Sequence, residues 1–184
     1  GIIIGTIGAT EQAAHQIALS CASFTFMVSM GLAQGSSIRV SNAFGLRNRL
    51  KITTIGKSTL ITALLYGTLC AVIFISLRNI LPVAFNENTD VIRMAALLLI
   101  YAAVFQISDA TQAIAAGLLR GIKDVKTPTL FIGIAYWVVG IPAGYYLAFN
   151  AGLGAVGIWI GFIVGLSCSS ILLCYRFLRM AKKV

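Results

Sequence analysis

Residues 127–175 read TPTLFIGIAYWVVGIPAGYYLAFNAGLGAVGIWIGFIVGLSCSSILLCY, a run of 49 amino acids without Asp, Glu, Lys or Arg. A helix needs about 20 apolar residues to cross the hydrocarbon core of a bilayer, which is about 30 Å thick. The run is too long for one crossing, and the sequence NAGLG at 150–154 is typical of a turn. It therefore predicts two membrane spans, at about 130–149 and 155–175.

Three stretches upstream of this run are also long enough to cross a bilayer. They predict spans at about 13–38, 58–77 and 94–119, and the third contains one charged residue, Asp109. The first eight residues, GIIIGTIG, are apolar but too short to cross, so they predict a partial helix at 1–8 that ends a further span. The predicted fold class is all-α, a polytopic transmembrane helix bundle with five full spans plus the end of a sixth. We expect residues 1–184 to form one domain and to be a fragment of a longer membrane protein.

The composition excludes several function classes. The chain is 59% hydrophobic and 10% charged, where a soluble domain carries about 25% charged residues. The net charge of +9 comes from Lys and Arg at the ends of apolar runs, which leaves no basic stripe to bind nucleic acid. The sequence has a single His and no HExxH, GxSxG or P-loop motif. We therefore expect no enzymatic activity, no cofactor and no nucleic-acid partner.

Lys and Arg are retained on the cytoplasmic side of membrane proteins. Twelve of the 14 basic residues fall in segments that the five spans place on one side: Arg39, Arg47, Arg49, Lys51, Lys57, Arg120, Lys123, Lys126, Arg176, Arg179, Lys182 and Lys183. The other side carries only Arg78 and Arg93. The pattern predicts an integral protein of the bacterial inner membrane, with membrane lipids as partners and a cytoplasmic basic tail at 176–184.

Small residues four apart let helix backbones approach closely in a membrane. This spacing occurs at Gly157, Gly161 and Gly165, at Gly140 and Gly144, and at Gly31 and Gly35. We expect each group to form a packing seam. Pro142 lies between two of these glycines, where it removes a backbone hydrogen bond and bends the helix, so it is a candidate hinge.

Asp109 is the main candidate for function because an ionised carboxylate inside a membrane is costly and is usually functional. Gln106 and Gln112 share its helix face at i−3 and i+3, and Ser108 and Thr111 are adjacent. This polar face predicts a position toward the bundle interior or a wet cavity. In the alternative interpretation, Asp109 is neutral and only hydrogen-bonds a neighbouring helix.

His15 is a weaker candidate, and we interpret it as a residue at the mouth of the first span, at headgroup level or capping the helix. The alternative is a proton relay. Trp159 is left open between an interface anchor and a pocket residue.

Two segments resemble the multidrug and toxic compound extrusion (MATE) family. AAHQIALSCASFTFMVSMGLAQGSSIRVSNAFG at 13–45 is similar to the family's eighth helix, with its AxHQIAxN and RVG elements. A second match is to the family's tenth helix: residues 104–128, VFQISDATQAIAAGLLRGIKDVKTP, are similar to it in the buried acidic residue and in the RG…D…P pattern that ends the helix. The resemblance covers essentially the whole chain, which would be the C-terminal lobe of a two-lobe transporter.

The resemblance implies efflux of organic, often cationic drugs in exchange for Na+ or H+, with the N-terminal lobe of the same protein as partner. It implies cation coupling at Asp109, the only residue at which Na+ binding is expected. Phe105 stands where some relatives have a Tyr, and a companion glutamate would lie upstream of Gly1. The alternatives are a lipid-linked saccharide flippase of the related superfamily, which would need cationic cavity residues, and a structural membrane subunit that does not transport.

Overall fold

The computed structural model describes residues 2–183, so Gly1 of the predicted partial helix and Val184 of the predicted tail lie outside the described residues. The helices in order are α1 (Ile2–Gly5), α2 (Ala9–Gly45), α3 (Arg49–Ser76), α4 (Thr89–Gly121), α5 (Lys126–Ile134), α6 (Ile141–Tyr145) and α7 (Ala155–Ala181). A 3-10 turn, η1 (Leu81–Ala84), precedes α4, and π-helical segments η2 (Ala135–Gly140) and η3 (Tyr146–Asn150) flank α6. Within the described range no strand is present, which confirms the predicted all-α class.

Across residues 2–183, five helices are long and apolar enough to cross a membrane, with Lys126–Asn150 counted as one. Three of them run past both ends of the predicted spans and the other two, α3 and α7, past one end, because hydropathy marks only the part of a helix that lies in hydrocarbon. For example, α4 has 33 residues and is about 50 Å long at 1.5 Å per residue. α7 continues to Ala181, so most of the predicted basic tail is helical.

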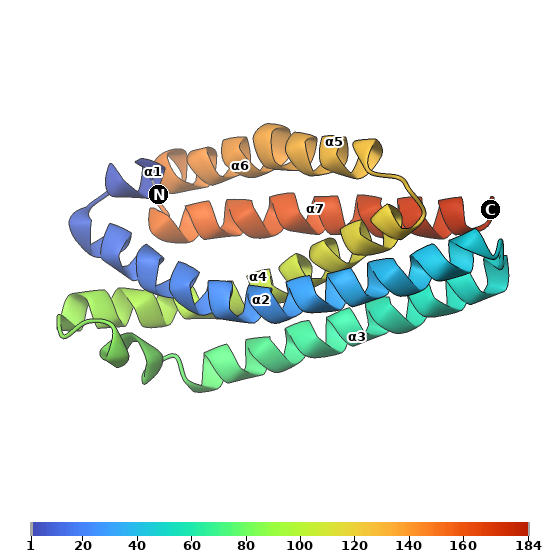
Figure 1. Ribbon diagram of the computed structural model, residues 1–184. Coiled ribbons are helices and arrows are strands. Elements are labelled where there is room, and N and C mark those ends of the chain that lie inside the picture. Colours follow the sequence, from blue (N-terminus) through green and yellow to red (C-terminus); the bar gives the residue numbers. More distant parts are fainter. Residues whose placement is uncertain (1, 184) are drawn as a thin grey trace.

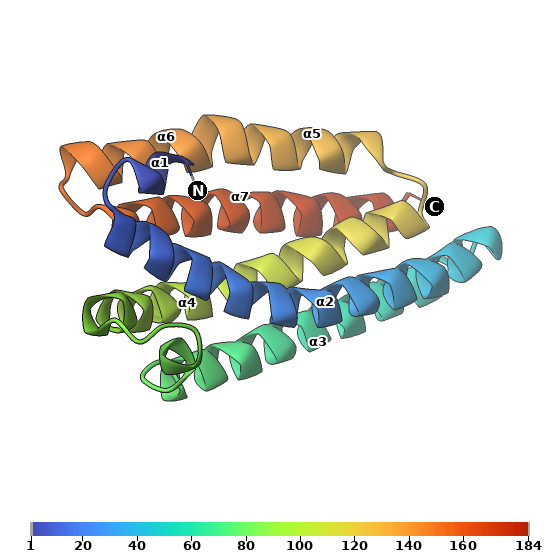
Figure 2. The same cartoon turned by 60° about the vertical axis from the view of Figure 1, so that its left-hand side comes forward.

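The helices form two groups joined by α4. In Figures 1 and 2, α2 runs beside α3, and α5 and α6 run beside α7. α4 crosses between the two groups and packs against α2, α3 and α7. Half of its most apolar part is buried, a share that it has in common with α7.

Glycines hold α6 close to α7. A Cβ added to Gly161 would meet Gly144 Cα and, at 2.7 Å, Gly140 O, while one added to Gly165 would meet Gly140 Cα at 3.0 Å. These contacts confirm the predicted seams on the last two spans. Gly31 and Gly35 form no such seam within residues 2–183, since a Cβ there would meet nothing within 4 Å.

The fourth long helix, Lys126–Asn150, changes its winding along its length. Pro142 lies in the first turn of α6, directly after the π-helical segment η2. Proline cannot donate the normal backbone hydrogen bond, and π-helical turns are common where a helix accommodates such a gap. The hinge role of Pro142 stays a prediction.

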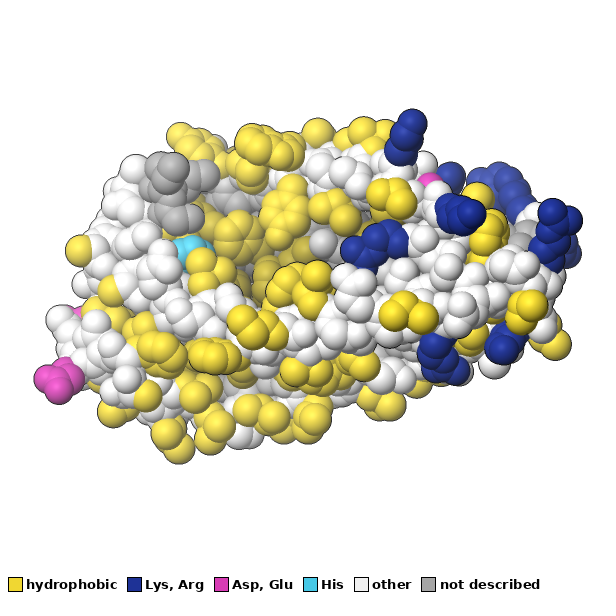
Figure 3. All heavy atoms as spheres, viewed as in Figure 1, with side chains coloured by type: hydrophobic (Ala, Val, Ile, Leu, Met, Phe, Trp, Pro, Cys, Tyr) yellow, Lys and Arg dark blue, Asp and Glu magenta, His cyan; other side chains and the backbone are white. Residues whose placement is uncertain are grey.

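Charged side chains lie mainly at the two ends of the molecule. Figure 3 shows Lys and Arg gathered at one end, acidic side chains at the other, and hydrophobic side chains over the middle. Many large apolar side chains in this middle zone are exposed, among them Phe24 at 69% and Met27 at 70%. An apolar zone between charged ends fits a bilayer, in which these side chains contact lipid.

Candidate functional site

The centre of the bundle is polar. One hydrophobic cluster takes its buried residues of α4 from the part between Val91 and Ala103, and a second takes buried residues between Ile114 and Ile122. No buried residue of the segment between them belongs to either cluster, although Phe105 and Ile107 pack against the first. At this level four helices contribute polar side chains, which we call the polar belt: Thr25 of α2, Tyr66 of α3, Gln106, Ser108 and Asp109 of α4, and Ser167 and Ser170 of α7.

Hydrogen bonds across the polar belt tie α4 to α2, and α2 in turn to α3. Thr25 Oγ1 donates to Gln106 Oε1, and Tyr66 Oη donates to the Thr25 carbonyl at 2.7 Å. Gln106 is only 1% exposed, and its Nε2 has no partner among the described residues. Bonds of this kind contribute about 0.6 kcal/mol each on average in a membrane helix bundle.

Other hydrogen bonds tie α4 to α7 on its opposite side. The Ser108 and Ser167 hydroxyls lie 2.9 Å apart, and Ser170 Oγ donates to the Ser108 carbonyl at 2.8 Å. The small serine side chains let the two helices approach closely. Together with the bonds to Thr25, they fix the rotation of α4 about its axis, which decides where Asp109 points.

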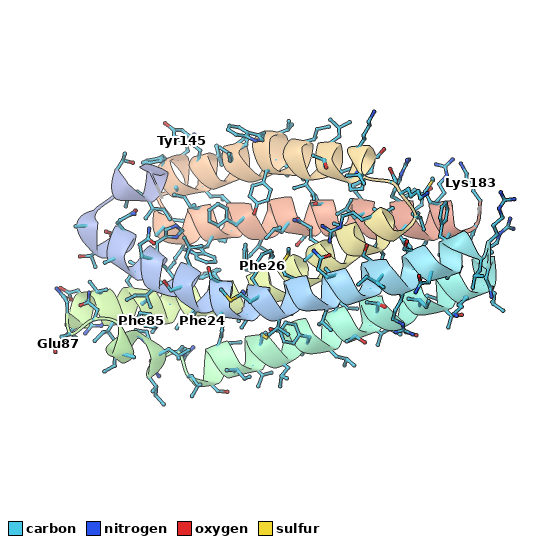
Figure 4. All side chains as sticks on the ribbon, viewed as in Figure 1. Phe24, Phe26, Phe85, Glu87, Tyr145 and Lys183 are labelled. Carbon is cyan, nitrogen blue, oxygen red and sulfur yellow. The ribbon has the colours of Figure 1, made fainter. Side chains whose placement is uncertain are left out.

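Asp109 opens into a pocket between α2 and α4 instead of pairing with a neighbouring helix. Its side chain is 9% exposed and has no hydrogen bond or ion pair within residues 2–183. The pocket has a volume of about 160 Å³ and is lined by Leu19, Ala22, Ser23, Phe26, Phe105 and Asp109. Figure 4 shows Phe26 projecting from α2 on the side of α7.

The size of this pocket limits what it could hold. Pockets for drug-sized ligands have volumes of about 300–1,000 Å³, so a space of about 160 Å³ suits a small ion or water. Tyr136 of η2 lies within electrostatic range of the Asp109 carboxylate. The described residues contain no group of three or more His, Cys, Asp or Glu that could hold a metal ion. A single carboxylate in such surroundings can take up a proton or a monovalent cation.

The other residues of the predicted polar face have different positions. Phe105 lies one turn before Asp109 and lines the same pocket, whereas Gln106 and Ser108 point to neighbouring helices through the bonds described above. Thr111 Oγ1 donates to the Ile107 carbonyl of its own helix at 2.8 Å. Gln112 is partly buried, and its Oε1 is without a partner in the described part of the chain.

His15 lies inside the bundle, so its interpretation as a headgroup-level residue is wrong. It is fully buried, with its ring 5.7 Å from that of Trp159 and 6.3 Å from that of Phe162. Phe105 joins the same cluster at 5.4 Å from Trp159. Trp159 is also fully buried, which excludes it as an interface anchor. α2 begins at Ala9, so His15 lies more than one turn inside the helix.

Sequence reasoning missed Thr25, Ser167 and Ser170 as partners of the central segment of α4, and Tyr66 as a partner of Thr25. Each is an uncharged polar residue in an apolar span, and such residues are common in membrane helices. The available signal was their depth, since all four lie well inside predicted spans at levels similar to Asp109.

The space beside the polar belt is the main hollow of this face. Figure 3 shows the surface hollowed between α2 and the α5–α6 helix, with hydrophobic side chains lining it. The hollow is bordered by elements from both helix groups, so a change in their relative position would change its width.

Comparisons with known proteins agree with this architecture. The chain is similar to the crystal structure of a eukaryotic MATE transporter, AtDTX14, with a TM-score of 0.86 and 23% identity over 95% of this chain and 40% of that one. It is also similar to the inward-facing conformation of a multidrug resistance MATE family transporter of the MOP superfamily, with a TM-score of 0.76 and 16% identity over 95% of this chain and 44% of that one. The chain thus spans less than half the length of either transporter. The family model MatE matches residues 1–146, which is most of the sequence. The chain therefore belongs to the MATE family of membrane proteins.

Proposed function

We propose that the protein containing this chain is a secondary active transporter that exports organic, often cationic compounds in exchange for Na+ or H+. The observation that carries the proposal is the Asp109 carboxylate, which lies at the level of the polar belt in the middle of α4 and opens into a small pocket without a charged partner in the described residues. Burying an ionisable carboxylate inside a membrane costs free energy, and such residues are typical of ion pathways.

The proposed exchange is a competition for this carboxylate. A cation or proton entering the pocket neutralises Asp109, which weakens its attraction for an organic cation in the adjacent hollow. Release of the ion on the other side restores the charge. Because binding at one site changes affinity at the other by the same factor in both directions, the two fluxes become coupled.

We propose that this chain supplies the C-terminal lobe and that the N-terminal lobe closes the hollow from the opposite side. The chain covers 40–44% of the two solved transporters it resembles, which leaves length for a second lobe in proteins of that size. Alternating access would then come from rocking of the lobes about the hollow. The candidate hinge at Pro142 would allow α5 and α6 to bend as the lobes move.

The proposed location is the bacterial inner membrane, with the basic end of the bundle in the cytoplasm. The support is the asymmetry of charge, since the turn after α2, the link after α4 and the end of α7 all carry Lys or Arg at the same end.

The test uses the full-length transporter in vesicles, with a fluorescent organic cation and an imposed Na+ or H+ gradient. We expect Asp109→Asn to reduce gradient-driven efflux to the rate seen without a gradient. The matched control is Asp90→Asn, which makes the same change in the first turn of the same helix, at its exposed end, and should retain efflux.

Unchanged exchange in Asp109→Asn, with both variants present at equal amounts in the membrane, would remove Asp109 from the mechanism. Absence of efflux in the parent protein under either gradient would favour a lipid-linked saccharide flippase or a structural subunit.

A further inference from the structure

A second pocket lies at the basic end of the bundle, far from the polar belt along the helices. Its volume is about 500 Å³, and its lining is Phe44, Arg47, Ile122, Met180 and Lys183. Three segments distant in sequence meet there: the turn after α2, the residue after α4 and the end of α7. The walls are apolar and the two polar lining residues are both cations.

The two cations of this pocket have no acidic partner within residues 2–183. Asp124 is the acidic residue near this end of the bundle, and it is engaged by Arg176 at 2.8 Å. The backbone of Arg47 has φ +53, a conformation that costs energy for a residue with a side chain. The tight turn after α2 therefore holds Arg47 at the pocket despite local strain.

The depth of the pocket corresponds to the headgroup layer. The predicted apolar spans end at 38 and 175, and the pocket residues Phe44 and Met180 lie six and five residues further along their helices. At 1.5 Å per residue these positions are about 8–9 Å beyond the hydrocarbon edge. The headgroup region adds about 5–8 Å on each side of a bilayer, so Phe44 and Met180 lie at its outer boundary, where the charged head of a lipid can reach the pocket.

We propose that this pocket binds the head of an anionic phospholipid, with its phosphate between Arg47 and Lys183 and its glycerol against the apolar wall of Phe44, Ile122 and Met180. Charge complementarity and depth select this occupant, because an apolar wall beneath a pair of unpaired cations matches a lipid with a charged head. The site joins the ends of α2, α4 and α7, so the bound lipid would link the two helix groups at their basic end.

The test places a fluorophore in the pocket with Phe44→Trp, in the protein reconstituted into phosphatidylcholine vesicles. Brominated phosphatidylglycerol is compared with brominated phosphatidylcholine as a quencher at equal mole fraction. The signal of Trp137 and Trp159 is subtracted with the parent protein measured in parallel. We expect stronger quenching by phosphatidylglycerol, and no displacement of it by inorganic phosphate.

Replacing both pocket cations, Arg47→Gln with Lys183→Gln, should lower the preference for phosphatidylglycerol about 30-fold, since each basic residue near an anionic headgroup contributes a factor of about five. The control Lys51→Gln with Lys57→Gln removes the same charge from exposed positions of α3 outside the pocket and should keep the preference.

Equal quenching by the two lipids in the Phe44→Trp protein would overturn the proposal, as would equal loss in the pocket and control variants. Displacement by inorganic phosphate would show an anion site without lipid selectivity and would overturn it as well. If Phe44→Trp fails to fold, Met180→Trp places the fluorophore on the opposite wall of the same pocket. Neither readout depends on transport, so failure here leaves the proposed exchange at Asp109 untouched.

Discussion

The glycine seam between α6 and α7 gives a stability prediction that can be worked out from the contacts. In Gly161→Ala the added methyl group would meet Gly144 Cα and N and, at 2.7 Å, Gly140 O. These are backbone atoms, which cannot rotate away, so the two helices must separate. Such overpacking costs about 1–3 kcal/mol. Gly31→Ala is the matched control, because its methyl group meets nothing within 4 Å.

Both substitutions gain the same helix propensity, about 0.8–1.0 kcal/mol for Ala over Gly, and this gain cancels when they are compared. We therefore expect the free energy of unfolding of Gly161→Ala to be about 1–3 kcal/mol lower than that of Gly31→Ala. The measurement is unfolding by SDS in mixed micelles, followed by far-ultraviolet circular dichroism. If the two variants agree within about 0.5 kcal/mol, the normal range for unconstrained surface sites, α6 does not pack on α7 as closely as the structure has it.

Two further predictions concern side-chain pairs. Gln106→Leu should lower the free energy of unfolding by about 0.6 kcal/mol, because it removes the bond from the Thr25 hydroxyl, which still has the Ala22 carbonyl as an acceptor at 2.8 Å. Adding Thr25→Val should recover part of this loss, and a double-mutant cycle that gives zero coupling instead of about 0.6 kcal/mol would contradict the bond. Asp124→Asn should cost at most about 1 kcal/mol, because its partner Arg176 is partly exposed. The cost should shrink as salt is raised, and a loss independent of salt would point to another cause.

The fold class could be predicted because it depends on long uncharged runs, which few sequences contain by chance. The ends of the helices could not, since backbone hydrogen bonding continues beyond the hydrocarbon: α2 begins at Ala9 and ends at Gly45. The pattern of Gly31 and Gly35 is equally compatible with a packed seam and an open face. Only the direction in which α2 is rotated decides between the two, and that rotation depends on tertiary contacts.

For the candidate site, sequence identified the residue but not its surroundings. Asp109 was evident as the one charge in its span, and the pocket it shares with Phe105 follows from their i, i+4 spacing. The burial of His15 against Trp159 could not be foreseen. These two residues are 144 positions apart in the chain, and nothing in the local pattern of either one specifies the contact.

The free energy of the hydrogen bonds in the polar belt can be compared with that of the charge on Asp109, the proposed ion site. Three interhelical hydrogen bonds hold the central part of α4 to its neighbours, which at about 0.6 kcal/mol each amounts to about 2 kcal/mol. An ionised Asp at the centre of a membrane helix costs about 2.5–3.5 kcal/mol on insertion scales. Neutralising this residue therefore changes the free energy by as much as the whole belt contributes. A carboxylate on α4, the helix that contacts both groups, is thus placed where a single binding event can outweigh the bonds that fix their relative position.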